Sequence, residues 1–194
     1  MRGTDIVEES PKDIGIMNMI GKPKRLDCLF QNYVAPVYFI TAVTAGRRPL
    51  LASEAIHEAL GAYAMDNVPN GRTMGRYVIM PDHLHFFVRL APESKISDYV
   101  RWLKTAITRC LTARCNPDLQ SQRIPDPRSQ CSTDLRSVVH EGFVWQPGFF
   151  DHVMRSRESY AQKWEYVRMN PVRAGLVDAA DKWPFQGEIE RIEM

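Results

Sequence analysis

Residues 77–90 read YVIMPDHLHFFVRL, and this stretch organises the rest of the chain. The pattern predicts two buried strands joined by a turn at Pro81-Asp82, because proline fixes its own φ and aspartate tolerates turn geometry. His83 and His85 open the second strand two residues apart, so both imidazoles project from one face, and Leu84 faces the core on the other. Two parallel imidazoles are half of a metal site. A His-x-His pair on its own is more often a pair of partly exposed sheet residues.

The segments around this hairpin alternate between strand and helix patterns. Residues 36–43 are rich in β-branched and aromatic residues, which is typical of a strand. Helices are expected from Ser53 to about Met65 and from the 92–97 region to about residue 115, the second with a clear apolar stripe. The second half of 143–154 favours another strand. The order β-α-β-β-α-β predicts an α+β fold, the ferredoxin-like sandwich, in which an antiparallel sheet carries two helices on one face.

A further helix is predicted from Ser156 to Asn170, just before Pro171. Three of its residues have helical spacing and are expected to pack inward: Tyr160, Trp164 and Val167. Tyr166 lies on a different face with Gln162 and Asn170, although a helical tyrosine is more often a packing residue than a nucleophile. Asn170 has two competing interpretations. Its amide oxygen can be a third ligand of a divalent cation, or it can cap a short helix begun by Pro171.

Length and composition favour one well-packed domain. The chain has 194 residues with a net charge of +2, and between residues 95 and 175 it carries thirteen Lys or Arg against eight Asp or Glu. A basic middle permits a polyanionic partner without requiring one. No run approaches the roughly 18 apolar residues of a membrane span. Four cysteines without a CxxC pair favour reduced thiols, so we expect a cytoplasmic protein with no membrane partner and no structural zinc.

We expect three parts along the chain. Residues 1–30 are interpreted as an N-terminal arm, residues 31–185 as the main domain, and residues 186–194 as a C-terminal tail. Within the main domain, residues 116–141 lack apolar periodicity and contain three prolines, which predicts a long loop insertion.

Three motifs occur in register with these elements: MPDHLH at 80–85, WQPGFFDH at 145–152 and YVRMNPVRAGLV at 166–177. Together they resemble the REP-associated tyrosine transposases, relatives of the single-tyrosine transposases of bacterial insertion sequences. The resemblance spans about residues 36–185. The arm and the 116–141 segment are longer than the compact members of that family need.

The resemblance implies an HUH nuclease on the ferredoxin-like core. His83 and His85 would be metal ligands for Mg²⁺ or Mn²⁺, Tyr166 would be the nucleophile, and Asn170 would complete the metal shell. The reaction would be cleavage and rejoining of a DNA strand through a 5′-phosphotyrosine, with no other cofactor. The partner would be single-stranded or hairpin DNA such as REP-like palindromes, bound by a monomer or a homodimer.

Two other functions fit the same residues. One is a ferredoxin-like nucleic-acid-binding protein without catalytic activity, which would need neither Tyr166 nor Asn170. The other is a metal hydrolase that activates water instead of tyrosine, with Asp82 or Asp151 as its base. A covalent protein–DNA adduct separates the transposase from both.

Overall fold

The computed structural model describes residues 35–115 and 144–193. The expected arm at residues 1–30 and the expected loop at residues 116–141 lie outside these ranges. Nine strands and α-helices are described, with short 3-10 turns η1 (Ala45–Arg47), η2 (Val68–Asn70) and η3 (Ala180–Lys182): β1 (Val37–Val43), α1 (Glu54–Asn67), β2 (Arg72–Ile79), β3 (His83–Leu90), α2 (Ile96–Cys115), β4 (Phe150–Met154), α5 (Arg157–Arg168), α6 (Asn170–Arg173) and β5 (Gln186–Glu188). None of the helices within these ranges is long and apolar enough to cross a membrane.

The strands form one antiparallel sheet in the order β4-β1-β3-β2-β5. The hairpin β2–β3 turns at residues 80–82, where the Met80 amide donates to the His83 carbonyl at 2.8 Å. Strand β1 lies between β3 and β4, so the first and last strands of the core are neighbours. The predicted ferredoxin-like order β-α-β-β-α-β is therefore confirmed.

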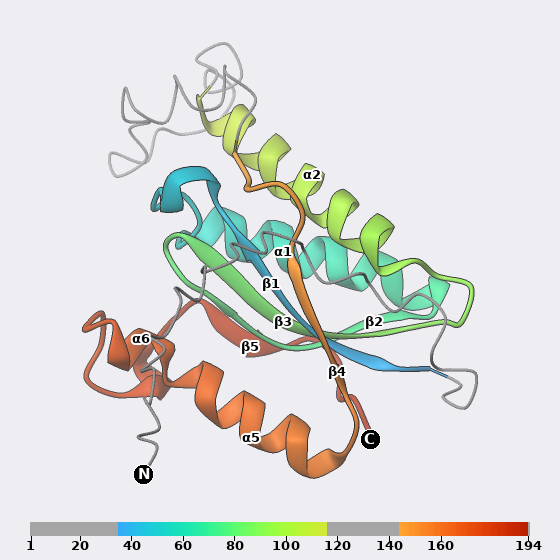
Figure 1. Ribbon diagram of the computed structural model, residues 1–194. Coiled ribbons are helices and arrows are strands. Elements are labelled where there is room, and N and C mark those ends of the chain that lie inside the picture. The colour runs from blue at the N-terminus through green and yellow to red at the C-terminus, as the bar shows by residue number, and fades with distance from the viewer. Residues whose placement is uncertain (1–34, 116–143, 194) are drawn as a thin grey trace, which may run out of the picture. The chain divides into compact units, whose positions relative to one another are not determined.

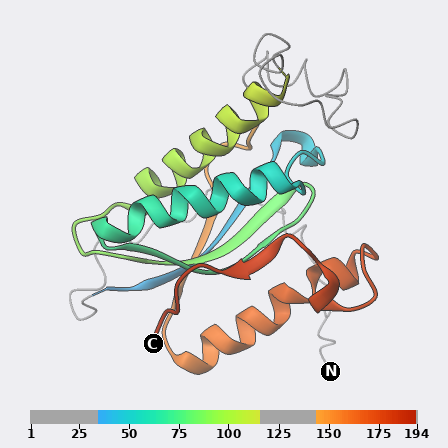
Figure 2. The same ribbon diagram turned by 180° about the vertical axis from the view of Figure 1, so that it is seen from behind.

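Helices cover both faces of the sheet (Figures 1 and 2). On one face α1 and α2 bury the apolar side of β3, including Leu84 and Phe86, as the alternation of the strand predicted. On the other face Phe87 packs against Tyr160 of α5, with ring centroids 4.3 Å apart. Because side chains alternate along a strand, His83 and His85 share this second face with Phe87.

Helix α5 begins where the sequence predicted. Ser156 is its N-cap, and its hydroxyl accepts from the Ser159 amide at 3.1 Å while Ser159 Oγ accepts from the Ser156 amide at 3.2 Å. Tyr160 and Val167 are buried, which confirms the inward stripe. The helix ends at Arg168 and not at Asn170, because Met169 is its C-cap, with φ −83° and ψ −2°, and α6 starts at the next residue.

The C-terminal segment corrects one expectation. Residues 186–194 were expected to be a tail, but Gln186–Glu188 form β5, which pairs with β2 and completes one edge of the sheet. Arg76 Nε and Glu188 Oε2 lie 3.3 Å apart across this edge, and Ile192 is buried beyond it. A strand of three residues is too short to be recognised in the sequence by the alternation of apolar and polar residues. Covering the edge of β2 removes exposed backbone donors and acceptors, which stabilises the pairing.

Candidate active site

The two histidines of β3 lie together on the α5 side of the sheet. The ring centroids of His83 and His85 are 4.7 Å apart with an interplanar angle of 81°, so the predicted common face is confirmed. His85 also stacks on Phe39 of β1, with ring centroids 5.4 Å apart and an interplanar angle of 19°. The His83 side chain keeps 17% of its surface exposed. The pair is thus held by the sheet while one ring stays accessible from outside.

Each imidazole is oriented through its Nδ1 atom. His83 Nδ1 lies 2.6 Å from Asp82 Oδ1, and His85 Nδ1 lies 2.8 Å from Thr41 Oγ1. Asp82 is itself held by Arg47 of η1, whose Nη1 donates to Asp82 Oδ2 at 2.9 Å. Metal-binding histidines are commonly oriented in this way, with one ring nitrogen bonded to a carboxylate or hydroxyl and the other directed at the ion. The two Nε2 atoms are therefore the ones suited to a metal.

The charge state of the site follows from its burial and its cations. Burial lowers the pKa of His85 to about 3, and the charges of His83, Lys163 and Arg173 act in the same direction. Burial by itself would raise the pKa of Asp82, but the hydrogen bonds and charges of His83 and Arg47 outweigh it and lower that pKa. At neutral pH His85 is therefore neutral, which is the state that a metal ion requires of an imidazole ligand, and Asp82 is ionised.

The depressed pKa of His85 predicts a pH dependence of stability for the metal-free protein. An unfolded histidine takes up a proton near pH 6.5, whereas folded His85 does so only near pH 3. Between about pH 6.5 and pH 3 the unfolded state binds more protons at His85 than the folded state does. The titration of His85 therefore leaves the free energy of unfolding unchanged above about pH 6.5 and lowers it as the pH falls toward 3. His85→Gln should make the decline between about pH 7 and pH 4.5 shallower. Urea unfolding of both proteins in a chelator measures this, and parallel pH profiles would contradict it.

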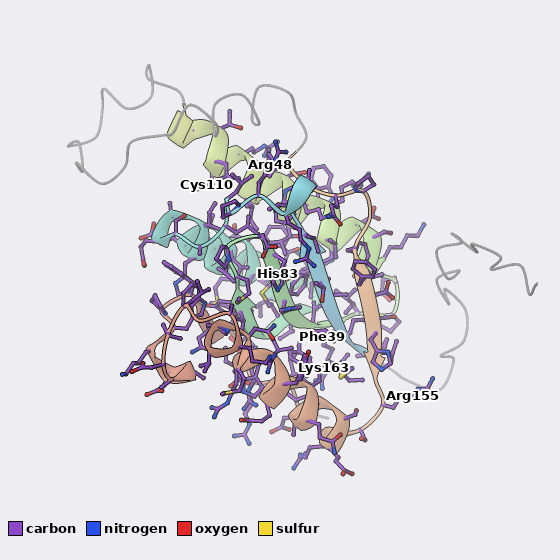
Figure 3. The ribbon with its side chains drawn as sticks, turned by 60° about the vertical axis from the view of Figure 1, so that its left-hand side comes forward. Phe39, Arg48, His83, Cys110, Arg155 and Lys163 are labelled. Carbon is purple, nitrogen blue, oxygen red and sulfur yellow. The ribbon has the colours of Figure 1, made fainter. Side chains whose placement is uncertain are left out.

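Tyr166 lies on the same side of the sheet as the histidine pair, with most of its ring exposed. Its side chain is 62% exposed, and the Arg173 guanidinium carbon is 4.1 Å from its ring centroid. Lys163 connects α5 to the sheet, because its Nζ lies 5.3 Å from the Phe39 ring centroid and 6.0 Å from that of Tyr166. Figure 3 shows Lys163 next to Phe39, on the side of the sheet where α5 lies. Since Phe39 stacks on His85, one chain of contacts joins the tyrosine helix to the histidines.

Tyr160 has a different environment from Tyr166. It is 6% exposed, packs on Phe87, and burial raises the pKa of its hydroxyl. A buried phenol that ionises less readily is a poor nucleophile, so the structure assigns Tyr160 to packing, as its place in the apolar stripe predicted.

Asn170 is the first residue of α6, and Met169 precedes it as the N-cap, so the interpretation of Asn170 as the cap is wrong. Its Oδ1 accepts a hydrogen bond from Arg173 Nη2, and the same nitrogen donates to the Tyr166 carbonyl at 2.6 Å. In this conformation Arg173 thus holds the oxygen that was predicted to be a metal ligand. In the part of the chain that the structure describes, no three His, Cys, Asp or Glu side chains come close enough to hold a metal. A third protein ligand from these residues would be of another type, such as an amide.

Four residues of this site were not predicted from the sequence: Phe39, Thr41, Lys163 and Arg173. Phe39 and Thr41 occupy a strand that shows only β-branched and aromatic content, and nothing in that pattern selects them. Arg173 does belong to the YVRMNPVRAGLV motif. Arg173 follows Tyr166 by seven residues, which is about two helical turns. This spacing could have indicated that the two side chains lie close together.

Comparison with known proteins finds similarity to transposases. Residues 35–124 match the family described as "Transposase IS200 like". A Haemophilus influenzae (strain Rd) protein assigned to the REP-associated tyrosine transposases is 27% identical over 151 residues, covering 77% of each chain. The Escherichia coli K12 REP-associated tyrosine transposase is 27% identical over 109 residues, covering 56% of this chain and 50% of its own.

A solved structure shares the fold. It is a REP-associated tyrosine transposase bound to a REP hairpin, with a TM-score of 0.55 and 21% identity, covering 82% of this chain and 81% of its own. The match to the family model covers a little under half of the chain, so these comparisons show a similarity to IS200-like transposases. Among these, the relatives that it resembles are REP-associated tyrosine transposases.

Proposed function

We propose that this protein cleaves and rejoins a single DNA strand with Tyr166 as its nucleophile and a divalent cation held by the histidine pair. The observation that supports it best is geometric. His83 and His85 lie 4.7 Å apart with both Nδ1 atoms already bonded, and Lys163 and Phe39 link them to the helix that carries Tyr166. A binding protein would need neither this pair nor an exposed tyrosine on the helix that is linked to it.

The residues present could supply a divalent cation with neutral ligands, two imidazole nitrogens and one amide oxygen, while a substrate phosphate would supply the negative charge. His83 and His85 would hold Mg²⁺ or Mn²⁺ through their Nε2 atoms, and Asn170 would supply an amide oxygen once Arg173 releases it. Two or three protein ligands leave positions for substrate oxygens. When bound, such an ion polarises the scissile phosphate and stabilises charge on the departing oxygen.

The residues of this chain have separate tasks in the reaction. The Tyr166 hydroxyl oxygen attacks the phosphorus, the phenol loses its proton, and the bond from phosphorus to the 3′ oxygen breaks. The 3′ oxygen takes up a proton and leaves as a hydroxyl, while the 5′ phosphate stays on the tyrosine. Reversal with another 3′ hydroxyl rejoins a strand without ATP. Lys163 and Arg173, both next to the tyrosine ring, place positive charge where the phosphate must lie.

We propose hairpin DNA with unpaired flanks, like REP palindromes, as the substrate. One solved relative binds a REP hairpin, and two curated relatives carry the same REP association in their names. Unpaired strand is also what a shallow site on a sheet can accept, because a base that is not stacked in a duplex is free to contact aromatic side chains.

The test is to trap the covalent intermediate. The full chain is incubated with a REP-like hairpin labelled at its 3′ end, in Mg²⁺, in Mn²⁺ and in chelator, and then separated on a denaturing gel. We expect the 3′-labelled fragment to migrate with the protein only when metal is present, and a 5′-labelled fragment to be released with a free 3′ hydroxyl. Metal-dependent nicks without an adduct would indicate a hydrolase that uses water. Binding without cleavage would indicate the non-catalytic alternative.

A further inference from the structure

The edge strand β4 places an aromatic ring on the sheet face that carries the histidines. In the strand register Phe150 is opposite Thr41, and Thr41 is opposite His85. Residues directly opposite in an antiparallel sheet point to the same face, and the hydrogen bond from Thr41 to His85 confirms this for the second pair. Phe150 therefore lies on the histidine face, two strands from His85, which is about 10 Å at the usual spacing between strands.

Phe150 is open to solvent, unlike Phe87 and Phe39 on the same face. It is 70% exposed, more than any other large hydrophobic residue in the described ranges. Phe87 is fully buried beneath α5, and Phe39 is partly buried, with Lys163 of the same helix over its ring. Helix α5 thus covers one end of the face and leaves the end with Phe150 uncovered. A single exposed phenylalanine is ordinary on a protein surface, so its position beside the site is what matters.

The residues that precede Phe150 anchor its strand to the rest of the fold. Gly148 takes a positive φ of 73° and its carbonyl accepts from Lys104 Nζ at 2.5 Å. Phe149 packs against the core, and Trp145 Nε1 donates to Thr108 Oγ1 of α2 at 3.1 Å. A ring on a strand that is anchored in this way loses little conformational freedom when a flat partner stacks on it.

The charges around this ring fit a nucleic-acid strand. Lys163 lies on the same face over Phe39, the next residue of β1 that faces this side after Thr41. The acidic neighbour Asp151 is opposite Ile40, whose side chain belongs to the other face, so the carboxylate points away from the ring of Phe150. Lys163 therefore supplies a cation on the sheet face that carries the Phe150 ring, while the carboxylate of Asp151 lies on the other face.

We propose that Phe150 is a stacking platform for an unpaired nucleobase next to the scissile phosphate, and that it thereby positions the strand for attack. This inference rests on the proposed function, because it needs a DNA strand in the site. One base stacked on Phe150 would hold the backbone across β1, with the phosphate near Lys163 and the histidines. An exposed aromatic ring accepts any base, so Phe150 supplies affinity and position without reading the sequence by hydrogen bonds.

The experiment measures binding in a Tyr166→Phe background, so that cleavage does not interfere. Hairpins with unpaired flanks are prepared with one abasic site at each flanking position in turn. We expect the parent to lose affinity at one of these positions, by about 5- to 150-fold, the range for one base stacked on an aromatic side chain. Phe150→Ala should lose a similar amount on the intact hairpin and should lose nothing further at that abasic position.

Two further variants separate stacking from simple hydrophobic contact. Phe150→Trp should retain the affinity, whereas Phe150→Leu should bind like Phe150→Ala. Trp102→Ala is the matched control, since Trp102 is an aromatic residue 50% exposed on α2, on the opposite face, and its loss should leave the abasic profile unchanged. Melting temperatures confirm that each variant is folded.

Two outcomes would overturn the proposal. If Phe150→Ala binds the intact hairpin like the parent, or shows the same loss at every abasic position, Phe150 is no platform, and cleavage by the otherwise unaltered chain would still support the proposed function. If the unaltered chain neither binds nor cleaves any hairpin, the proposed function fails and this inference fails with it.

Discussion

Tyr166→Phe should abolish the covalent adduct with DNA while binding of the hairpin survives. The substitution keeps the ring and its contact with Arg173, at 4.1 Å, and removes only the hydroxyl oxygen. Because that oxygen would form the bond to phosphorus, we expect cleavage to fall by more than about a thousandfold, as is usual when a nucleophile is removed. A denaturing gel with 3′-labelled hairpin measures cleavage, and a filter or mobility assay measures binding.

Tyr160→Phe is the matched control for this experiment. Tyr160 lies on the same helix, but six residues correspond to a rotation of about 120° on a helix, and its ring is buried against Phe87. We expect this variant to cleave like the parent. An adduct that survives in Tyr166→Phe, or disappears in Tyr160→Phe, would show that the nucleophile has been assigned to the wrong tyrosine.

His83→Ala should abolish cleavage and weaken Mn²⁺ binding with little loss of stability. His83 is at the first position of β3 and keeps part of its surface exposed. Removing one of two imidazole ligands should lower metal affinity by at least about a hundredfold, because losing only an outer-sphere partner of a ligand already costs 10- to 100-fold. Calorimetric titration with Mn²⁺ and the adduct assay measure the two effects.

His57→Ala provides the opposite pattern as a control. His57 lies on α1, and its Nε2 is 2.6 Å from the Tyr77 hydroxyl, so its loss removes a partly buried hydrogen bond between helix and sheet. We expect a lower melting temperature, with unchanged Mn²⁺ binding and unchanged cleavage by the folded protein. Full Mn²⁺ affinity in His83→Ala would mean that the ion, if one is used, binds elsewhere.

The sequence alone was sufficient for features that depend on local geometry. His83 and His85 had to share a face because alternation along a strand is a property of the backbone, whatever the strand pairs with. The start of α5 at Ser156 was predictable for a similar reason, since an N-cap involves only neighbouring residues. The order of strands and helices followed from periodicity and narrowed the topology to the ferredoxin-like arrangement.

The tertiary structure alone decided what surrounds the histidines. Thr41 and Phe39 contact His85 because β1 pairs with β3 in one particular register, and a shift of one residue would turn both side chains to the other face. The hydrogen bond from Arg173 to Asn170 depends on the end of α5 at Met169. The pairing of β5 with the sheet depends on the open edge of β2. These contacts join residues from separate elements, and their energies arise only after the sheet has assembled. A one-dimensional pattern therefore predicts which residues can form the site, and the packing of the sheet against α5 determines which of them meet.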